Sequence, residues 1–73
     1  MMQELLWIHQ KIGKDECMRI VLTRDDYTIH VDKTDLVGQF NGCFRIVRSN
    51  GRIVSINPNA VAMVSTLKKE AYL

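Results

Sequence analysis

The sequence contains one pattern twice, at a constant offset of 25 residues and with no gap between the aligned positions. Residues 21–36 align with residues 46–61. Each copy reads as an apolar strand, a polar tight turn, a second apolar strand, an Asp or Asn, a short polar turn and an apolar residue. A repeated strand–turn–strand unit constrains the fold strongly, because neither copy can bury its apolar face alone. The repeat therefore predicts a β-rich architecture, and it leaves the chemistry open.

The size of the chain limits it to one small domain. The sequence has 73 residues, of which 47% are hydrophobic and 25% are charged, a composition typical of a globular protein. One hydrophobic core barely offsets the chain entropy of a domain of this size. We therefore expect a single domain over residues 1–73 that gains stability by burying a face against another copy, which makes a homo-oligomer the expected state.

Charge is distributed unevenly along the chain. The formal net charge is +2, and residues 1–35 carry seven acidic and five basic side chains. Residues 36–69 carry no acidic side chain and five basic ones, which are Arg45, Arg48, Arg52, Lys68 and Lys69. Such a two-ended chain steers a polyanion to one end or aligns subunits head to tail. An uneven scatter of surface charges is the alternative.

Residues 2–12 have the spacing of an amphipathic helix. The stripe at i, i+3, i+4 and i+7 is apolar apart from one histidine, and consists of Leu5, Ile8, His9 and Ile12. Leu6 and Trp7 lie away from the centre of that stripe. They must cover something, so we predict a protein interface there, on the open end of a sheet or on a neighbouring subunit.

From Cys17 to Leu67 the spacing of the apolar residues changes to the period of two that half-buried strands show. We expect a mostly β fold, in which four to five short antiparallel strands form a small SH3/Sm-like barrel next to the N-terminal α-helix. Asp25-Asp26 is a turn candidate between the first two strands. Residues 68–73 are expected to be a frayed tail.

The apolar pattern selects the register of the second hairpin. With a three-residue loop, Ser49-Asn50-Gly51, whose glycine is in the left-handed conformation, Ile46 pairs with Val54. One face then carries Phe44, Ile46, Val54 and Ile56, and the other carries Arg45, Val47, Ile53 and Ser55. A two-residue loop would mix polar and apolar residues on the core face. The chosen register places Arg48 beside Arg52 at the tip, where like charges repel unless an anion lies between them.

The residue patterns that enzymes and metal centres need are missing from the sequence. His9 and His30 lie on different elements, with no evident nucleophile as partner. Cys17 and Cys43 form no CxxC pair and begin strand-like runs, so we expect reduced thiols rather than zinc ligands or a disulfide. The glycines are isolated and form no phosphate-binding motif. We expect no enzyme activity, catalytic residue, metal or cofactor.

The remaining candidate is the basic second hairpin. Arginine suits phosphate contacts, and exposed aromatic side chains stack on bases. The predicted binding residues, for nucleic acid or another partner, are Arg45, Arg48, Asn50, Arg52, Lys68 and Lys69, with Tyr27 and Phe40 as stacking residues. A solvated hairpin end with buried aromatic residues is the alternative.

Two stretches resemble the Sm-like barrel, including its bacterial Hfq type. Val37-Gly38-Gln39-Phe40 followed by Asn41 resembles the first Sm motif, and residues 56–64 resemble the strand–turn–strand of the second. Within the second stretch, Asn57-Pro58 predicts an N-cap and one 3₁₀ turn. The resemblance implies a helix followed by five bent strands, and RNA binding. Pro58-Asn59 stand where the Hfq-type uridine site has a Lys-His pair.

A second resemblance is to the small FlbD-type swarming motility proteins. Residues 20–24, Ile-Val-Leu-Thr-Arg, are similar to their opening strand, and the later Asn-Gly hairpin is similar too. We predict a small non-enzymatic regulatory or adaptor protein of bacterial or phage origin, which acts through protein binding and self-association. The alternative is an RNA- or DNA-binding barrel that uses the basic second hairpin.

The apolar runs are short. Leu5-Leu6-Trp7-Ile8 follows a glutamate and lacks the form of a signal peptide, and residues 60–64 are far too few to cross a bilayer. We therefore expect a cytoplasmic protein without membrane contact.

Overall fold

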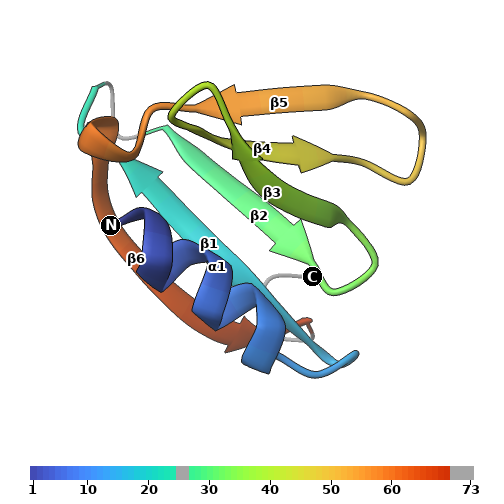
Figure 1. Ribbon diagram of the computed structural model, residues 1–73. Helices are drawn as coiled ribbons and strands as arrows, with labels where there is room; N and C mark the ends of the chain where they lie inside the picture. The colour runs from blue at the N-terminus through green and yellow to red at the C-terminus, as the bar shows by residue number, and fades with distance from the viewer. Residues whose placement is uncertain (25–26, 70–73) are drawn as a thin grey trace.

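The fold is mostly β with one N-terminal helix, which confirms the predicted class (Figure 1). The computed structural model describes residues 1–24 and 27–69. The predicted turn at Asp25-Asp26 and the last four residues of the predicted tail lie outside this part. The elements are α1 (Met2–Lys11), β1 (Glu16–Leu22), β2 (Thr28–Asp32), β3 (Leu36–Phe40), β4 (Cys43–Val47), β5 (Ile53–Ile56), the 3₁₀ turn η1 (Pro58–Ala60) and β6 (Val61–Lys68).

The strands of the described residues form two antiparallel sheets, ordered β2-β1-β6 and β3-β4-β5. These are six strands, where four to five were expected, and the two sheets do not close into one barrel. The tight turn at Asn41-Gly42 reverses the chain directly from β3 into β4, because both residues have positive φ, 51° and 78°. Helix α1 packs against β1, β3 and β4 and so occupies the opening between the sheets.

Each copy of the repeat ends at the first residue of a further strand, Leu36 for β3 and Val61 for β6, and each of these strands joins the sheet of the other copy. Hairpin β1-β2 belongs to the first copy, and its sheet is completed by β6 from the second. Hairpin β4-β5 belongs to the second copy, and its sheet is completed by β3 from the first (Figure 1). Each copy therefore contributes to both sheets, which ties the halves of the chain into one core.

The aligned repeat does need a gap of one residue, contrary to the sequence prediction. Ile20 pairs with Ile29 in the first hairpin, and Ile46 pairs with Val54 in the second. The equivalent residues are therefore offset by 26 positions in the first strand (46 − 20) and by 25 in the second (54 − 29). The first hairpin is one residue longer, because strand pairing must keep the buried side chains on the core face.

The core lies between the sheets and under the helix. Its buried apolar residues come from every strand except β3, and from α1 and the residue after it: Leu5, Ile12, Cys17, Met18, Ile20, Ile29, Val31, Phe44, Ile46, Ile56 and Val61. The predicted helix stripe is confirmed in that Leu5, His9 and Ile12 are buried. The helix itself ends at Lys11, because Ile12 has an extended backbone. Its buried histidine is satisfied, since His9 Nε2 donates to the carbonyl oxygen of Asp32 at 2.9 Å.

The predicted register of the second hairpin and the predicted 3₁₀ turn are both confirmed. Ile46 lies opposite Val54, and the glycine of the three-residue loop has φ 87°. Asn57 caps η1 by accepting a hydrogen bond from the N–H of Asn59 at 2.9 Å, and Pro58 occupies the first turn. In the described residues, no helix is both long and apolar enough to span a membrane.

Gly51→Ala is expected to lower the free energy of unfolding by about 1 kcal/mol, because an L-residue is strained in the left-handed region. Gly38→Ala is the matched control: its φ is not positive, and an added Cβ would have no atom within 4 Å. Urea titration followed by circular dichroism measures both variants. Equal stability of the two would contradict the left-handed assignment.

Candidate functional site

Arg48 is directed inward, toward the turn between β2 and β3. Its Nη1 donates to Asp35 Oδ2 at 2.8 Å and to the carbonyl oxygen of His30 at 2.6 Å. The side chain of Asp35 is only 5% exposed, and the same Oδ2 accepts the N–H of Asp32 at 2.9 Å. The backbones of Arg48 and Arg52 do pair, as predicted, through a 2.7 Å hydrogen bond. The two guanidinium groups were expected to repel each other unless an anion lay between them. In the structure, a carboxylate of the protein itself, that of Asp35, binds the guanidinium group of Arg48.

The other predicted basic residues do not gather around that tip. Lys68 Nζ lies 3.5 Å from a carboxylate oxygen of Asp15, and Lys69 Nζ lies 3.9 Å from one of Asp32. Both lysines therefore have acidic neighbours on the β2-β1-β6 side of the molecule. At the tip itself, the Asn50 side chain accepts the N–H of Arg52 at 2.9 Å, which is a local turn interaction. Among the described residues, Arg45 and Arg52 have no carboxylate partner.

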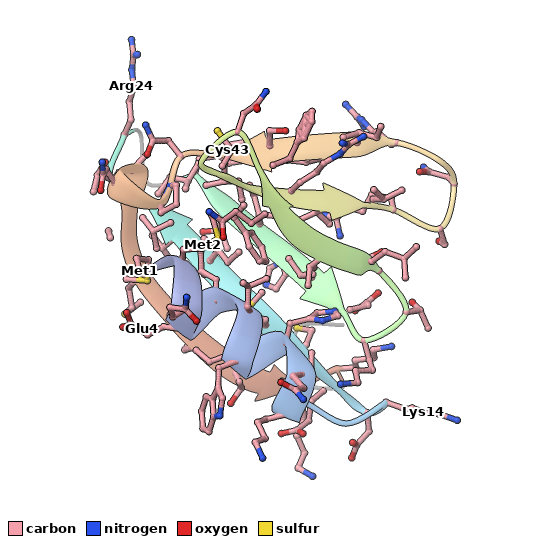
Figure 2. All side chains as sticks on the ribbon, in the orientation of Figure 1. Met1, Met2, Glu4, Lys14, Arg24 and Cys43 are labelled. Carbon is pink, nitrogen blue, oxygen red and sulfur yellow. The ribbon has the colours of Figure 1, made fainter. Side chains whose placement is uncertain are left out.

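An apolar row crosses the outer face of the β3-β4-β5 sheet. The register places Leu36 opposite Val47, and Val47 opposite Ile53, so that these three side chains form a line across the strands. Leu36 is 69% exposed and Ile53 is 52% exposed. Phe40, 48% exposed, and Cys43 lie opposite each other further along the same face. Figure 2 labels Cys43 at the start of β4. Exposed apolar side chains that share one face mark a surface suited to binding.

Gly38 leaves an open hollow at the β3 edge of this face. The hollow has a volume of about 280 Å³ and is lined by Leu36, Val37, Gly38, Gln39, Phe40, Arg45 and Val47. Leu36 and Phe40 stand on either side of Gly38 along β3, and the missing side chain leaves open space between them, since an added Cβ would touch nothing within 4 Å. We call this set of seven residues the sheet-face hollow.

Arg45 supplies the charge of the sheet-face hollow. Its guanidinium carbon lies 4.8 Å from the centroid of the Phe40 ring, a cation–π distance. Its Nε is buried and has no hydrogen-bond partner among residues 1–24 and 27–69. Stacking of this kind fixes a guanidinium group beside an apolar surface, so the hollow can accept an apolar group and an adjacent anion together.

Leu6 and Trp7 have different surroundings. Leu6 is half-buried and packs against the core, whereas Trp7 is 60% exposed. A second hollow of about 270 Å³ adjoins the tryptophan and is lined by Trp7, Ile8, Lys11, Ile12, Glu16 and Thr66. An interface on Leu6 and Trp7 stays a prediction, with Trp7 as its accessible member.

The sheet-face hollow was not among the predicted sites, although the signal for it was present. The register chosen from sequence puts Val47 and Ile53 on the face opposite the core, where polar residues are expected. Two apolar residues on an outer face indicate a binding surface, and Gly38 between two large apolar residues indicates the hollow. Of the two predicted stacking residues, Phe40 lines this hollow, and Tyr27 is exposed immediately before β2.

The described residues contain no group of three side chains suited to holding a metal ion. Cys17 is buried and Cys43 is half-buried. No family model, no curated protein and no solved structure matches this chain. The function is therefore inferred from the geometry of the site.

Proposed function

We propose that this chain is a small, non-enzymatic regulatory or adaptor protein that binds another protein through the outer face of the β3-β4-β5 sheet. The observation that carries the proposal is the sheet-face hollow, with Leu36 and Phe40 exposed around Gly38. An apolar side chain of the partner enters the hollow, and the surrounding strand residues exclude water. This is the arrangement of a buried anchor within a protein interface.

The size of the apolar surface fits a modest affinity. Full burial of an exposed Leu, Ile or Phe side chain contributes about 1.5–3 kcal/mol, and the three exposed ones here are already about one third to one half covered. Burying Leu36, Phe40 and Ile53 then contributes about 1 kcal/mol each. Association costs several kcal/mol in lost freedom. A partner therefore needs further contacts to bind stably, which suits a reversible regulatory contact.

Nucleic-acid binding, which the Sm-like resemblance implies, is the weaker candidate. A phosphate backbone is bound by several basic groups that release its counterions. Three of the five predicted basic residues already lie beside carboxylates in this chain, which leaves Arg45 and Arg52. Binding by two arginines predicts a shallow dependence of the affinity on salt concentration.

A photo-reactive residue tests the proposal directly. We expect a chain with p-benzoylphenylalanine in place of Leu36 to form a defined covalent adduct with a protein in extracts of its source organism. The same group in place of Lys14, which projects into solvent from the turn between α1 and β1, is the matched control and should give none (Figure 2). Addition of Gly38→Ile, which fills the hollow, should remove the adduct. Mass spectrometry identifies the product.

Equal adducts from positions 36 and 14 would contradict binding at the sheet face. An adduct that nuclease digestion shortens would favour the nucleic-acid alternative instead. An adduct of twice the mass of the chain would identify a second copy as the bound protein.

A further inference from the structure

We propose that the sheet-face hollow takes the exposed Trp7 of a second copy of this chain, so that molecules associate head to tail. The inference rests on the proposed function, because it names the partner of the same surface. Three features carry it. The chain has an exposed aromatic side chain, Trp7, and an open hollow on the sheet face. An acidic residue, Glu4, adjoins Trp7, and a basic residue, Arg45, lines the hollow.

Trp7 is the exposed aromatic side chain, and the carboxylate of Glu4 lies beside it on the helix. Residues three and four positions apart adjoin each other on a helix, so Glu4 and Lys11 flank Trp7 on α1. Lys11 Nζ lies 5.7 Å from the centroid of the indole ring. The Glu4 side chain is 65% exposed, its Oε1 lies 3.2 Å from the N-terminal amino group of Met1, and with Gln3 and Trp7 it lines one shallow depression. Figure 2 shows Glu4 on the outer side of the helix.

The hollow has the complementary charge. Arg45 lines it without a carboxylate partner among the described residues, and no acidic residue occurs between positions 36 and 69. When the indole of one molecule enters the hollow of the next, Glu4 lies one helical turn from the anchor and supplies the missing carboxylate to Arg45. Charge-assisted pairing at the edge of an apolar contact fixes the orientation of the helix on the sheet.

Face-to-face pairing of two sheets is less favourable. It would bring the Arg45 groups of two copies onto one apolar surface that offers no acidic side chain, and like charges at an interface cost free energy. The Trp7 depressions and the sheet-face hollow share no lining residue, so one molecule can use both surfaces at once. A contact between two different surfaces generates open chains or rings rather than closed dimers.

Sedimentation over a wide range of concentrations tests the association. We expect the mean mass of the wild-type protein to rise with concentration and to pass the mass of a dimer. Trp7→Ala removes the anchor, and Gly38→Ile fills the hollow, so each should lower the association constant about tenfold or more. Gly38→Ile keeps the fold, because a β-branched residue suits the strand and open space surrounds the position.

Mixing the two variants gives the sharpest test. The Trp7→Ala chain retains an intact hollow, and the Gly38→Ile chain retains an intact tryptophan. An equimolar mixture should form a dimer with one chain of each kind and grow no further, since neither exposed end of that dimer can bind. Recovery of binding in the mixture also shows that both variants are folded.

Charge exchange tests the orientation. Glu4→Arg and Arg45→Glu should each weaken association and reverse the sign of its salt dependence, because salt then screens a repulsion. The double variant should recover most of the association constant. A wild-type chain that stays monomeric at every concentration overturns the inference, and so does a mixture of variants that forms no dimer. In either case, an adduct between position 36 and a different protein would leave the proposed function standing.

Discussion

Phe44→Ala is expected to destabilise the fold more than any other substitution considered for this chain. Phe44 is fully buried in the central strand of its sheet, opposite Gln39 on β3 and Ile56 on β5. Truncation of a buried phenylalanine removes about 3–5 kcal/mol through lost transfer free energy and the cavity left behind. A domain of 73 residues has a total stability of about 4–11 kcal/mol at ordinary values per residue. The loss therefore consumes much of the stability, and urea denaturation or the far-ultraviolet circular dichroism spectrum should reveal it.

Phe40→Ala is the matched control, four residues earlier in the same hairpin. Phe40 projects from the outer face and is 48% exposed, so its truncation should lower the free energy of unfolding by only about 1 kcal/mol. It should instead reduce binding at the sheet-face hollow. A reversed order of the two effects, with Phe40→Ala the more destabilising, would mean that the two faces of this sheet have been exchanged.

The sequence predicted the local structure of this chain well, because local structure follows from spacing. The helix stripe, the left-handed Gly51 and the pairing of Ile46 with Val54 all rest on a few neighbouring residues whose apolar side chains must share a face. The cap at Asn57 and the turn after it follow from the preferences of two adjacent residues. These features are encoded within the segments that show them.

The tertiary arrangement was less accessible, because it depends on which segments meet. The pairing of β1 with β6 joins strands that are far apart in the sequence, and the strands form two sheets where one barrel was expected. An alignment of the two copies by residue type did not reveal the extra residue of the first hairpin. Alignments with and without a one-residue gap match similar residue types, and only the strand pairing shows which side chains are buried. The same dependence on distant partners made Arg48 look like a ligand-binding residue.

The arrangement of the strands also bears on the candidate site. Strand β3 follows the turn that Asp35 closes, and it forms one edge of the sheet whose outer face holds the hollow. The pair formed by Asp35 and Arg48 joins the start of β3 to the end of β4, which are the two strands that line the hollow. Arg48, predicted from the sequence as a binding residue, therefore holds together the two strands that form the sheet-face hollow.

Arg48→Ala is accordingly expected to destabilise the fold rather than to remove a ligand contact. The substitution leaves the carboxylate of Asp35, which is 5% exposed, without its cation, and leaves the carbonyl of His30 without a charged donor. Breaking such a pair costs about 3–5 kcal/mol when both groups are buried. Arg48 is itself 27% exposed, so we expect a loss of about 2–3 kcal/mol in the free energy of unfolding. Urea titration measures it.

Arg52→Ala is the control that distinguishes a stabilising role of the hairpin tip from a role in anion binding. Arg52 pairs with Arg48 through the backbone, and its side chain has no carboxylate partner among the described residues, so the variant should stay within about 0.5 kcal/mol of wild type. Replacing the pair together, as Asp35→Leu with Arg48→Met, should recover much of the stability that Arg48→Ala loses, because no unpaired charge then remains buried. If Arg48→Ala unfolds at the same urea concentration as Arg52→Ala, the inward ion pair contributes nothing to the fold. Arg48 would then be free to act as the anion-binding residue that its position at a hairpin tip suggests.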